Sequence, residues 1–191
     1  NARTVLHRSL RGEADLLRDK DTNYGVAFWE PDDRYVAVYG RTDIWRLDPQ
    51  AIRKPINLTR GYGAKHNVTL RLVNRADVLS SSELSKDLVL TGFNNESKEN
   101  GFFTLKYNRT AILSLKCMDA YTYNFQPTSI LVSSYPCIDP TKFLPVKSKE
   151  RNIYIVRRMS SKEEPNLYCT SDFINYRQIS FIDQTKGINW Y

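Results

Sequence analysis

The stretch from Tyr24 to Thr59 most constrains what this 191-residue chain can fold into, because it contains four short apolar runs separated by turn signals. The turn signals are Pro31-Asp32-Asp33, Gly40-Arg41-Thr42 and Asp48-Pro49. Short strands joined by short turns favour an antiparallel meander, in which strands adjacent in sequence pair with one another. We therefore expect one complete four-stranded sheet, with strands over residues 24–29, 35–39, 43–47 and 55–59.

The same order of short strands and polar hairpins returns twice. The later expected strands cover residues 67–73, 88–90, 102–107 and 111–115, and then 152–156, 166–170 and 178–182. A large aromatic residue stands at each third-strand position: Trp45, Phe103 and Tyr168, spaced 58 and 65 residues apart. Between the strands, Gly61-Tyr62-Gly63 predicts a turn, and the Ser-rich segment 74–86 predicts a loop with one helical turn near residues 82–84.

A repeated four-stranded unit predicts an all-β fold, a partial β-propeller of about three four-stranded antiparallel blades. The expected blades cover roughly residues 24–59, 68–116 and 121–182, and residues 1–20 are expected to be the end of a preceding blade or a linker. A β-sandwich of two sheets is the alternative architecture. Propellers usually hold about four to eight blades. We therefore expect the chain to be part of a larger ring, with exposed blade edges unless further sequence or a partner covers them.

Charge and hydropathy exclude two classes of partner. The formal net charge is +7, but the densest basic groups, residues 142–151 and Arg157-Arg158, alternate with acidic and apolar residues. This pattern is typical of solvated strand faces, so we expect no nucleic-acid interface. No run of about eighteen apolar residues occurs, so we expect no membrane span.

The cysteines and histidines do not predict a metal site. Cys117, Cys137 and Cys169 are irregularly spaced, and His7 and His66 lie far apart. A Cys117–Cys137 disulfide and buried thiols both remain open. The compartment also remains open: an exported or periplasmic location would require that a signal peptide was removed upstream of Asn1. Four glycosylation sequons, too short to be diagnostic, begin at Asn57, Asn67, Asn95 and Asn108.

Several segments resemble a known family. They are Tyr24-Gly25 and residues 29–35, 43–49, 55–59, 165–168 and 187–190. Together they resemble the N-terminal propeller of the prolyl oligopeptidase family of serine peptidases. The turn at Pro31 to Arg34 is similar to the Pro-Asp-Gly turn of such blades, although Asp33 stands where Gly is commonest.

The resemblance implies a bipartite enzyme, in which the propeller restricts access of short peptides to an α/β-hydrolase domain of the same parent chain. In that family the hydrolase domain carries a Ser nucleophile in a GxSxG elbow, followed by Asp and His. No GxSxG occurs in this chain. We therefore expect a noncatalytic part that needs no cofactor or metal, with its substrate-binding residues unassigned. The alternative is a propeller that binds or scaffolds other molecules without an attached enzyme.

Some polar residues invite a functional interpretation. Glu163-Glu164 can be compared with the paired glutamates that hold a substrate amino terminus in dipeptidyl-peptidase members of the family, but a hairpin turn is the expected setting. Neither His7 nor His66 is accompanied in sequence by the nucleophile and acid that a catalytic base needs. Turn caps are expected at Asp32-Asp33, Asp48 and Asp183. Blade core is expected for Trp29, Trp45, Phe102, Phe103, Tyr107 and Tyr168.

Overall fold

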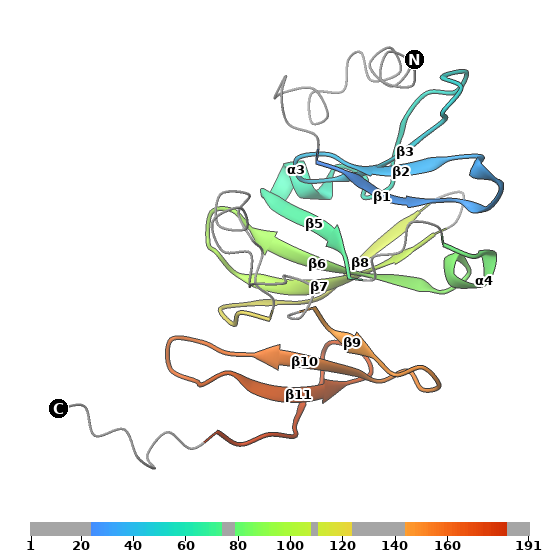
Figure 1. Ribbon diagram of the computed structural model, residues 1–191. Helices are drawn as coiled ribbons and strands as arrows, with labels where there is room; N and C mark the ends of the chain where they lie inside the picture. The colour runs from blue at the N-terminus through green and yellow to red at the C-terminus, as the bar shows by residue number, and fades with distance from the viewer. Residues whose placement is uncertain (1–23, 74–78, 108–110, 124–143, 183–191) are drawn as a thin grey trace, which may run out of the picture. The chain divides into compact units, whose positions relative to one another are not determined.

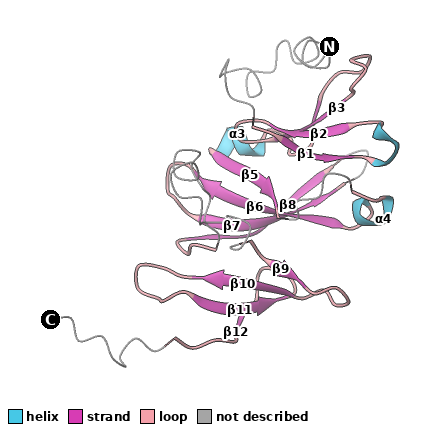
Figure 2. Cartoon of the chain, in the orientation of Figure 1, coloured by secondary structure: helices cyan, strands magenta, loops and turns pink. Residues whose placement is uncertain are grey.

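The computed structural model describes residues 24–73, 79–107, 111–123 and 144–182 of the chain (Figure 1). The chain divides into two compact units, residues 1–98 with 102–118 and residues 99–101 with 119–191. The described residues form three four-stranded antiparallel sheets, and the strands of each sheet follow one another in chain order (Figure 2). The prediction of an all-β chain built from four-stranded meanders is therefore confirmed.

The first sheet has the predicted strands and order. It comprises β1 (Val26–Trp29), β2 (Val36–Tyr39), β3 (Ile44–Leu47) and β4 (Ile56–Asn57). The first turn is a short 3-10 segment, η1 (Pro31–Asp33), in which Asp32 and Asp33 have φ of 65° and 51°. L-residues rarely adopt this left-handed region, which explains why glycine suits such a turn.

The second sheet lies in the same unit except for residues 100, 101 and 119. It comprises β5 (Val68–Leu72), β6 (Asp87–Asn94), β7 (Asn100–Lys106) and β8 (Ile112–Asp119). The predicted helical turn is α4 (Ser81–Leu84), which begins with a capping box between Ser80 and Glu83.

The turn predicted at Gly61-Tyr62-Gly63 is present only at Gly61, because a short helix, α3 (Tyr62–His66), begins at Tyr62. A Cβ atom on the buried Gly63 would lie 2.7 Å from the carbonyl oxygen of Val68 and 2.8 Å from that of Thr42. Close contact with the neighbouring backbone therefore requires glycine at this position, and it is tertiary packing that sets the local structure.

The two sheets of this unit pack face to face around one apolar core. From the first sheet the core takes Ala27, Phe28, Ala37, Ile44 and Leu58; from the second it takes Leu70, Leu72, Leu90, Phe103 and Leu105. The opposite face of the first sheet carries a separate buried cluster of Val36, Trp45 and Leu47. Ile44 and Trp45 are consecutive, so they point to opposite faces of β3, and apolar residues line both faces of this sheet.

The third sheet belongs to the second unit. It comprises β9 (Val146–Lys147), β10 (Tyr154–Arg158), β11 (Asn166–Thr170) and β12 (Arg177–Gln178). Strand β9 was not predicted, and the expected strand over residues 178–182 is instead the two-residue β12. The predicted aromatic residues Trp45, Phe103 and Tyr168 all lie on the third strand of their sheet, and all are buried.

The first and third sheets have the same cross-strand register. Val38, Trp45 and Asn57 form one row of paired residues in the first sheet, and Val156, Tyr168 and Gln178 form the matching row in the third. The neighbouring row is also equivalent. It consists of Ala37, Arg46 and Ile56 in the first sheet and of Ile155, Cys169 and Arg177 in the third. Residues separated by more than one hundred positions therefore occupy equivalent places in two separate sheets.

The equivalence extends to side-chain hydrogen bonds at the start of the third strand. In the first sheet the Ile44 N–H donates to Thr59 Oγ1 at 3.1 Å, and the Thr59 hydroxyl donates to the Asp43 carboxylate. In the third sheet the Leu167 N–H donates to Ser180 Oγ at 2.7 Å, and the Ser180 hydroxyl donates to Asn166 Oδ1 at 3.1 Å. A hydroxyl residue thus joins the third strand to the segment after the fourth strand in both sheets.

Asp43 is the most heavily bonded member of these two sets. Its fully buried carboxylate accepts hydrogen bonds from the hydroxyls of Thr42 and Thr59 and from the N–H groups of Gly63 and Ala64. The two N–H groups belong to the first turn of α3, so this one carboxylate joins β3, the end of β4 and α3.

We predict that Asp43→Ala lowers the free energy of unfolding by about 3–5 kcal/mol, because it leaves buried donors without an acceptor. Asp43→Asn should cost less, since asparagine occupies the equivalent position 166. Urea unfolding followed by circular dichroism measures both changes. The exposed Asp87→Asn is the control, expected to stay within about 0.5 kcal/mol. Equal stability of Asp43→Ala and the control would contradict this role.

Candidate functional site

The acidic pair Glu163-Glu164 lies in the turn between β10 and β11, as predicted for turn residues. The Glu163 carboxylate accepts hydrogen bonds from Arg158 Nη2 at 3.3 Å and from the Tyr121 hydroxyl at 3.0 Å. Its backbone N–H donates to Ser160 Oγ at 3.0 Å. Glu163 therefore already has a cationic partner within its own unit.

Glu164 has different surroundings. Its Oε2 atom is buried and has no hydrogen-bond partner among the residues that the structure describes. Its backbone carbonyl accepts a long hydrogen bond of 3.5 Å from the Asn166 side chain. The two neighbouring carboxylates are thus not equivalent, and the comparison with a matched pair of amine-binding glutamates gains no support from their contacts.

Arg158 is held between two tyrosine rings. Its guanidinium carbon lies 4.1 Å from the ring centroid of Tyr121 and 4.0 Å from that of Tyr168. Burial lowers the pKa of Arg158, but the hydrogen bond with the Tyr168 hydroxyl and the nearby acidic groups outweigh burial, so the pKa is raised overall. The hydrogen bond to Glu163 is the main cause of the raised pKa of Tyr121. Cation and rings stabilise one another in this stack.

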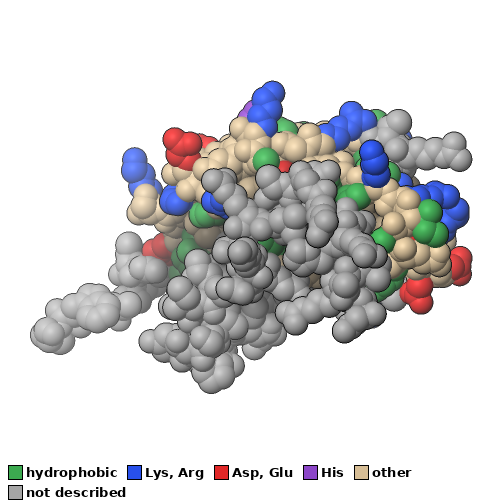
Figure 3. Space-filling model, turned by 90° about the horizontal axis from the view of Figure 1, so that it is seen from above, with side chains coloured by type: hydrophobic (Ala, Val, Ile, Leu, Met, Phe, Trp, Pro, Cys, Tyr) green, Lys and Arg blue, Asp and Glu red, His purple; other side chains and the backbone are tan. Residues whose placement is uncertain are grey.

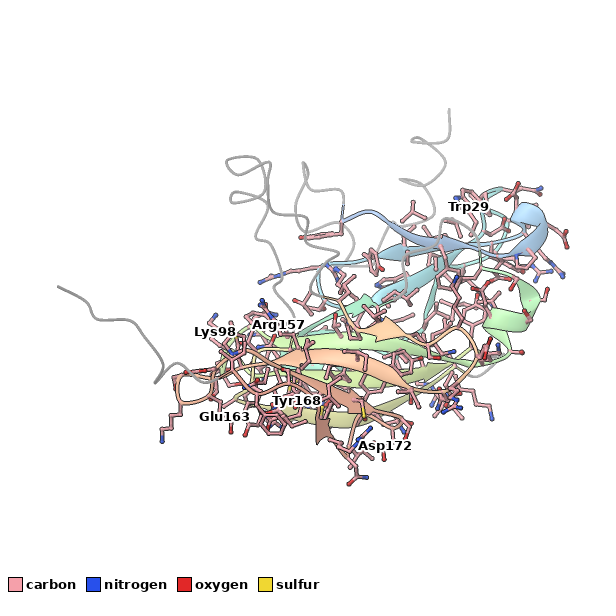
Figure 4. The ribbon with its side chains drawn as sticks, turned by 60° about the horizontal axis from the view of Figure 1, so that its bottom comes forward. Trp29, Lys98, Arg157, Glu163, Tyr168 and Asp172 are labelled. Carbon is pink, nitrogen blue, oxygen red and sulfur yellow. The ribbon has the colours of Figure 1, made fainter. Side chains whose placement is uncertain are left out.

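The stack attaches the segment before the third sheet to β10 and β11. Thr122 and Met159 form an isolated antiparallel bridge beside it, and the Thr122 N–H donates to the Met159 carbonyl at 2.8 Å. Tyr123 stacks on Tyr176 with ring centroids 5.5 Å apart. Figure 4 places Glu163 and Asp172 at opposite ends of the sheet, with Tyr168 between them. These contacts hold residues 121–123 against the third sheet within the second unit.

A second polar cluster links the two sheets of the first unit. The Tyr107 hydroxyl donates to Glu30 Oε1, and Tyr107 also shares a hydrogen bond with Arg46. Burial, followed by the Glu30 carboxylate, raises the pKa of Tyr107. Arg46 stacks on the Tyr35 ring, 4.7 Å from its centroid. This cluster connects the ends of β1 and β7 through the hydrogen bond between Tyr107 and Glu30, although Arg46 Nε is buried without a hydrogen-bond partner among the described residues.

The remaining predicted site residues occupy structural positions. Asp48 caps its turn by accepting the N–H groups of Gln50 and Arg53, as predicted. His66 is exposed at the end of α3, with its ring 4.3 Å from that of Tyr62.

The aromatic residues predicted for the core differ in burial. Phe102 and Phe103 are fully buried, whereas Tyr107 is only partly buried, as is Trp29 beside the Trp45 cluster. His7, Asp183 and Cys137 lie outside the described residues. Cys117 and Cys169 both carry a thiol.

Three features of the described part bear on ligand class. Within it, no group of three or more His, Cys, Asp or Glu side chains is arranged to hold a metal ion. None of its helices is long and apolar enough to cross a membrane. Basic side chains are spread over the coloured surface in Figure 3 rather than gathered in one patch there.

Sequence reasoning missed the stacking of Arg158 on both Tyr168 and Tyr121. For Tyr168 a signal was available, because the pairing of β10 with β11 places Arg158 opposite Asn166 and on the same face as Tyr168. Tyr121 precedes the sheet and forms no part of that pattern, so its contact depends on tertiary structure alone.

We predict that Arg158→Lys lowers the free energy of unfolding by about 1–2 kcal/mol, because an ammonium group cannot lie flat between two rings. Glu163→Gln should cost less than about 1 kcal/mol, since Glu163 is 42% exposed and water screens its ion pair. Urea unfolding of both variants provides the measurement. A larger loss from Glu163→Gln than from Arg158→Lys would show that the ion pair dominates instead.

We also predict that Asp172 makes stability depend on acid pH. Its carboxylate accepts the N–H groups of Asn175 at 2.8 Å and Ile174 at 2.9 Å, and these bonds hold its pKa below the usual range. A folded-state pKa below the unfolded value adds stability above about pH 4, and this contribution is lost as pH falls through the folded pKa. The Tm of the wild type should therefore approach that of Asp172→Asn as pH falls from 5 to 2. Parallel Tm curves for the two proteins would contradict this.

Comparisons with protein-family models, with curated proteins and with solved structures find no match to this chain. The described residues therefore establish an all-β fold with three four-stranded antiparallel sheets.

Proposed function

We propose that this chain is a noncatalytic β-propeller part of a serine-type peptidase of the prolyl oligopeptidase family. In this role it restricts entry so that short peptides reach an α/β-hydrolase domain of the same parent chain. The support comes from two sources: the resemblance of the segments around residues 24–59 to such blades, and the repeated geometry of the sheets.

The observation that carries the proposal is the shared register of the first and third sheets. Each sheet is a separate meander, and the same rows of residues pair in both, down to the hydroxyl groups of Thr59 and Ser180. Repeated, self-contained four-stranded sheets are typical of propeller blades. Sandwich folds instead connect two sheets by Greek-key crossovers, which the chain-ordered strands of these sheets do not require.

The proposed gating role comes from the resemblance, and the contacts of the described polar side chains are in keeping with a structural role. Arg158, Glu163, Tyr107 and Asp43 are all engaged with protein partners, and their contacts stabilise the sheets. A part of this kind contributes to an enzyme by shape and by exclusion, while the reacting groups belong to a separate domain.

The test uses the longest product of the reading frame and a fluorophosphonate probe, which reacts covalently with activated serine nucleophiles. We predict labelling of that product, loss of labelling when the Ser of its GxSxG elbow is changed to Ala, and no labelling of the 191-residue chain alone. A product that has no GxSxG, or that is not labelled, would overturn the peptidase assignment and favour a binding or scaffold propeller.

A further inference from the structure

One face of the third sheet is open. Because paired residues share a face and alternate residues along a strand return to it, this face consists of Val146, Ile155, Arg157, Leu167, Cys169 and Arg177. Val146 is 65% exposed and Leu167 is 43% exposed. Ile179, whose N–H donates to the Leu167 carbonyl, is 42% exposed. We call this set the open face.

The opposite face of the same sheet is closed. Tyr154, Val156, Asn166, Tyr168 and Thr170 are all buried. The closed face is therefore buried throughout, whereas the open face is exposed at Val146 and Leu167 and partly exposed at Ile155 and Cys169. An antiparallel sheet that is meant to meet water on one face normally carries polar residues there.

The first sheet shows what covers the equivalent face. Ile44 occupies the position of Leu167, and the Leu58 N–H donates to the Ile44 carbonyl at 2.9 Å, as that of Ile179 does to Leu167 at 2.8 Å. Ile44 is fully buried and Leu58 is 1% exposed, because both lie in the core between the first and second sheets. The second sheet contributes Phe103 from its third strand to that core.

We propose that the open face is the docking surface for a further four-stranded antiparallel sheet, whose third strand presents a large aromatic side chain to Leu167 and Ile179. This inference rests on the propeller part of the proposed function, and it adds the contact between the third sheet and the sheet that would follow it. The repeat itself identifies the occupant, since the same register in the first sheet is covered by a sheet of that kind. The incoming sheet would also meet the exposed Arg177, which lies on the same face opposite Cys169.

The test follows the reactivity of Cys169, which lies on the open face. Cys117→Ser with Cys137→Ser leaves Cys169 as the sole cysteine of the 191-residue chain, and the probe is a bulky fluorescent maleimide. The same probe is applied to the longest product of the reading frame, with its other cysteines changed to serine. We expect labelling of Cys169 there to be at least about 10-fold slower than in the 191-residue chain, because the docked sheet must first separate locally from the open face. Leu167→Lys with Ile179→Lys should restore fast labelling in that product.

Two controls make the result specific. Ser161→Cys in a cysteine-free background places the thiol on the exposed turn between β10 and β11, and its labelling rate should be equal in both chain lengths. Ile174→Lys changes an exposed apolar residue that is not part of the open face, so Cys169 should stay protected.

Equal labelling of Cys169 in both chain lengths would overturn the docking proposal. Protection in the 191-residue chain that grows with protein concentration would identify a second copy as the occupant, and would also overturn it. Fluorophosphonate labelling separates this failure from that of the proposed function. If the longest product reacts with the fluorophosphonate and Cys169 reacts fast with the maleimide, the protein is a peptidase without this contact. If the longest product does not react with the fluorophosphonate and Cys169 is protected, the sheet is docked in a scaffold protein.

Discussion

The buried carboxylate of Asp43 is the interaction on which the first unit depends. A buried charge is stable only when hydrogen bonds replace the water it has lost, and here two hydroxyls and two backbone N–H groups do so. Because these donors come from Thr42, from Thr59 after β4 and from the start of α3, one side chain sets the direction in which the chain leaves the first sheet. The chain then enters β5, and the Leu70 N–H donates to the Thr42 carbonyl at 2.8 Å. A local polar contact therefore leads directly into the stacking of two sheets.

Stacking is required because the first sheet is apolar on both faces. Ile44 faces the core shared with the second sheet, and its neighbour Trp45 faces the cluster with Val36 and Leu47. A sheet with one apolar face could be covered by a single partner layer, but a sheet with two apolar faces must lie within a series of layers. On β11 the consecutive residues Leu167 and Tyr168 alternate in the same way, with Tyr168 buried and Leu167 43% exposed.

The sequence allowed the meanders to be predicted, but not the contacts that join them. Residues 24–59 contain their own turn signals, so strand order and register follow from local chemistry, and the helical turn α4 lies in the Ser-rich segment that predicted it. Helix α3 begins among glycines, and the carboxylate that caps it lies twenty positions earlier. Strand β9 has only two residues, both exposed, and so lacks any periodic pattern. The stack of Arg158 between Tyr121 and Tyr168 joins residues that no period relates.

The difference between Asp43 and Asn166 follows from the number of donors that each must satisfy. Asp43 receives two backbone N–H groups as well as two hydroxyls, and an ionised carboxylate has acceptor sites for all four. Asn166 Oδ1 receives the Ser180 hydroxyl and the Ile182 N–H, which a neutral amide oxygen can accept. The more demanding set lies where a second sheet is already docked, and the simpler set lies beside the open face. Within one repeated design, the polar residue at the start of the third strand therefore matches the number of donors that the following segment brings to it.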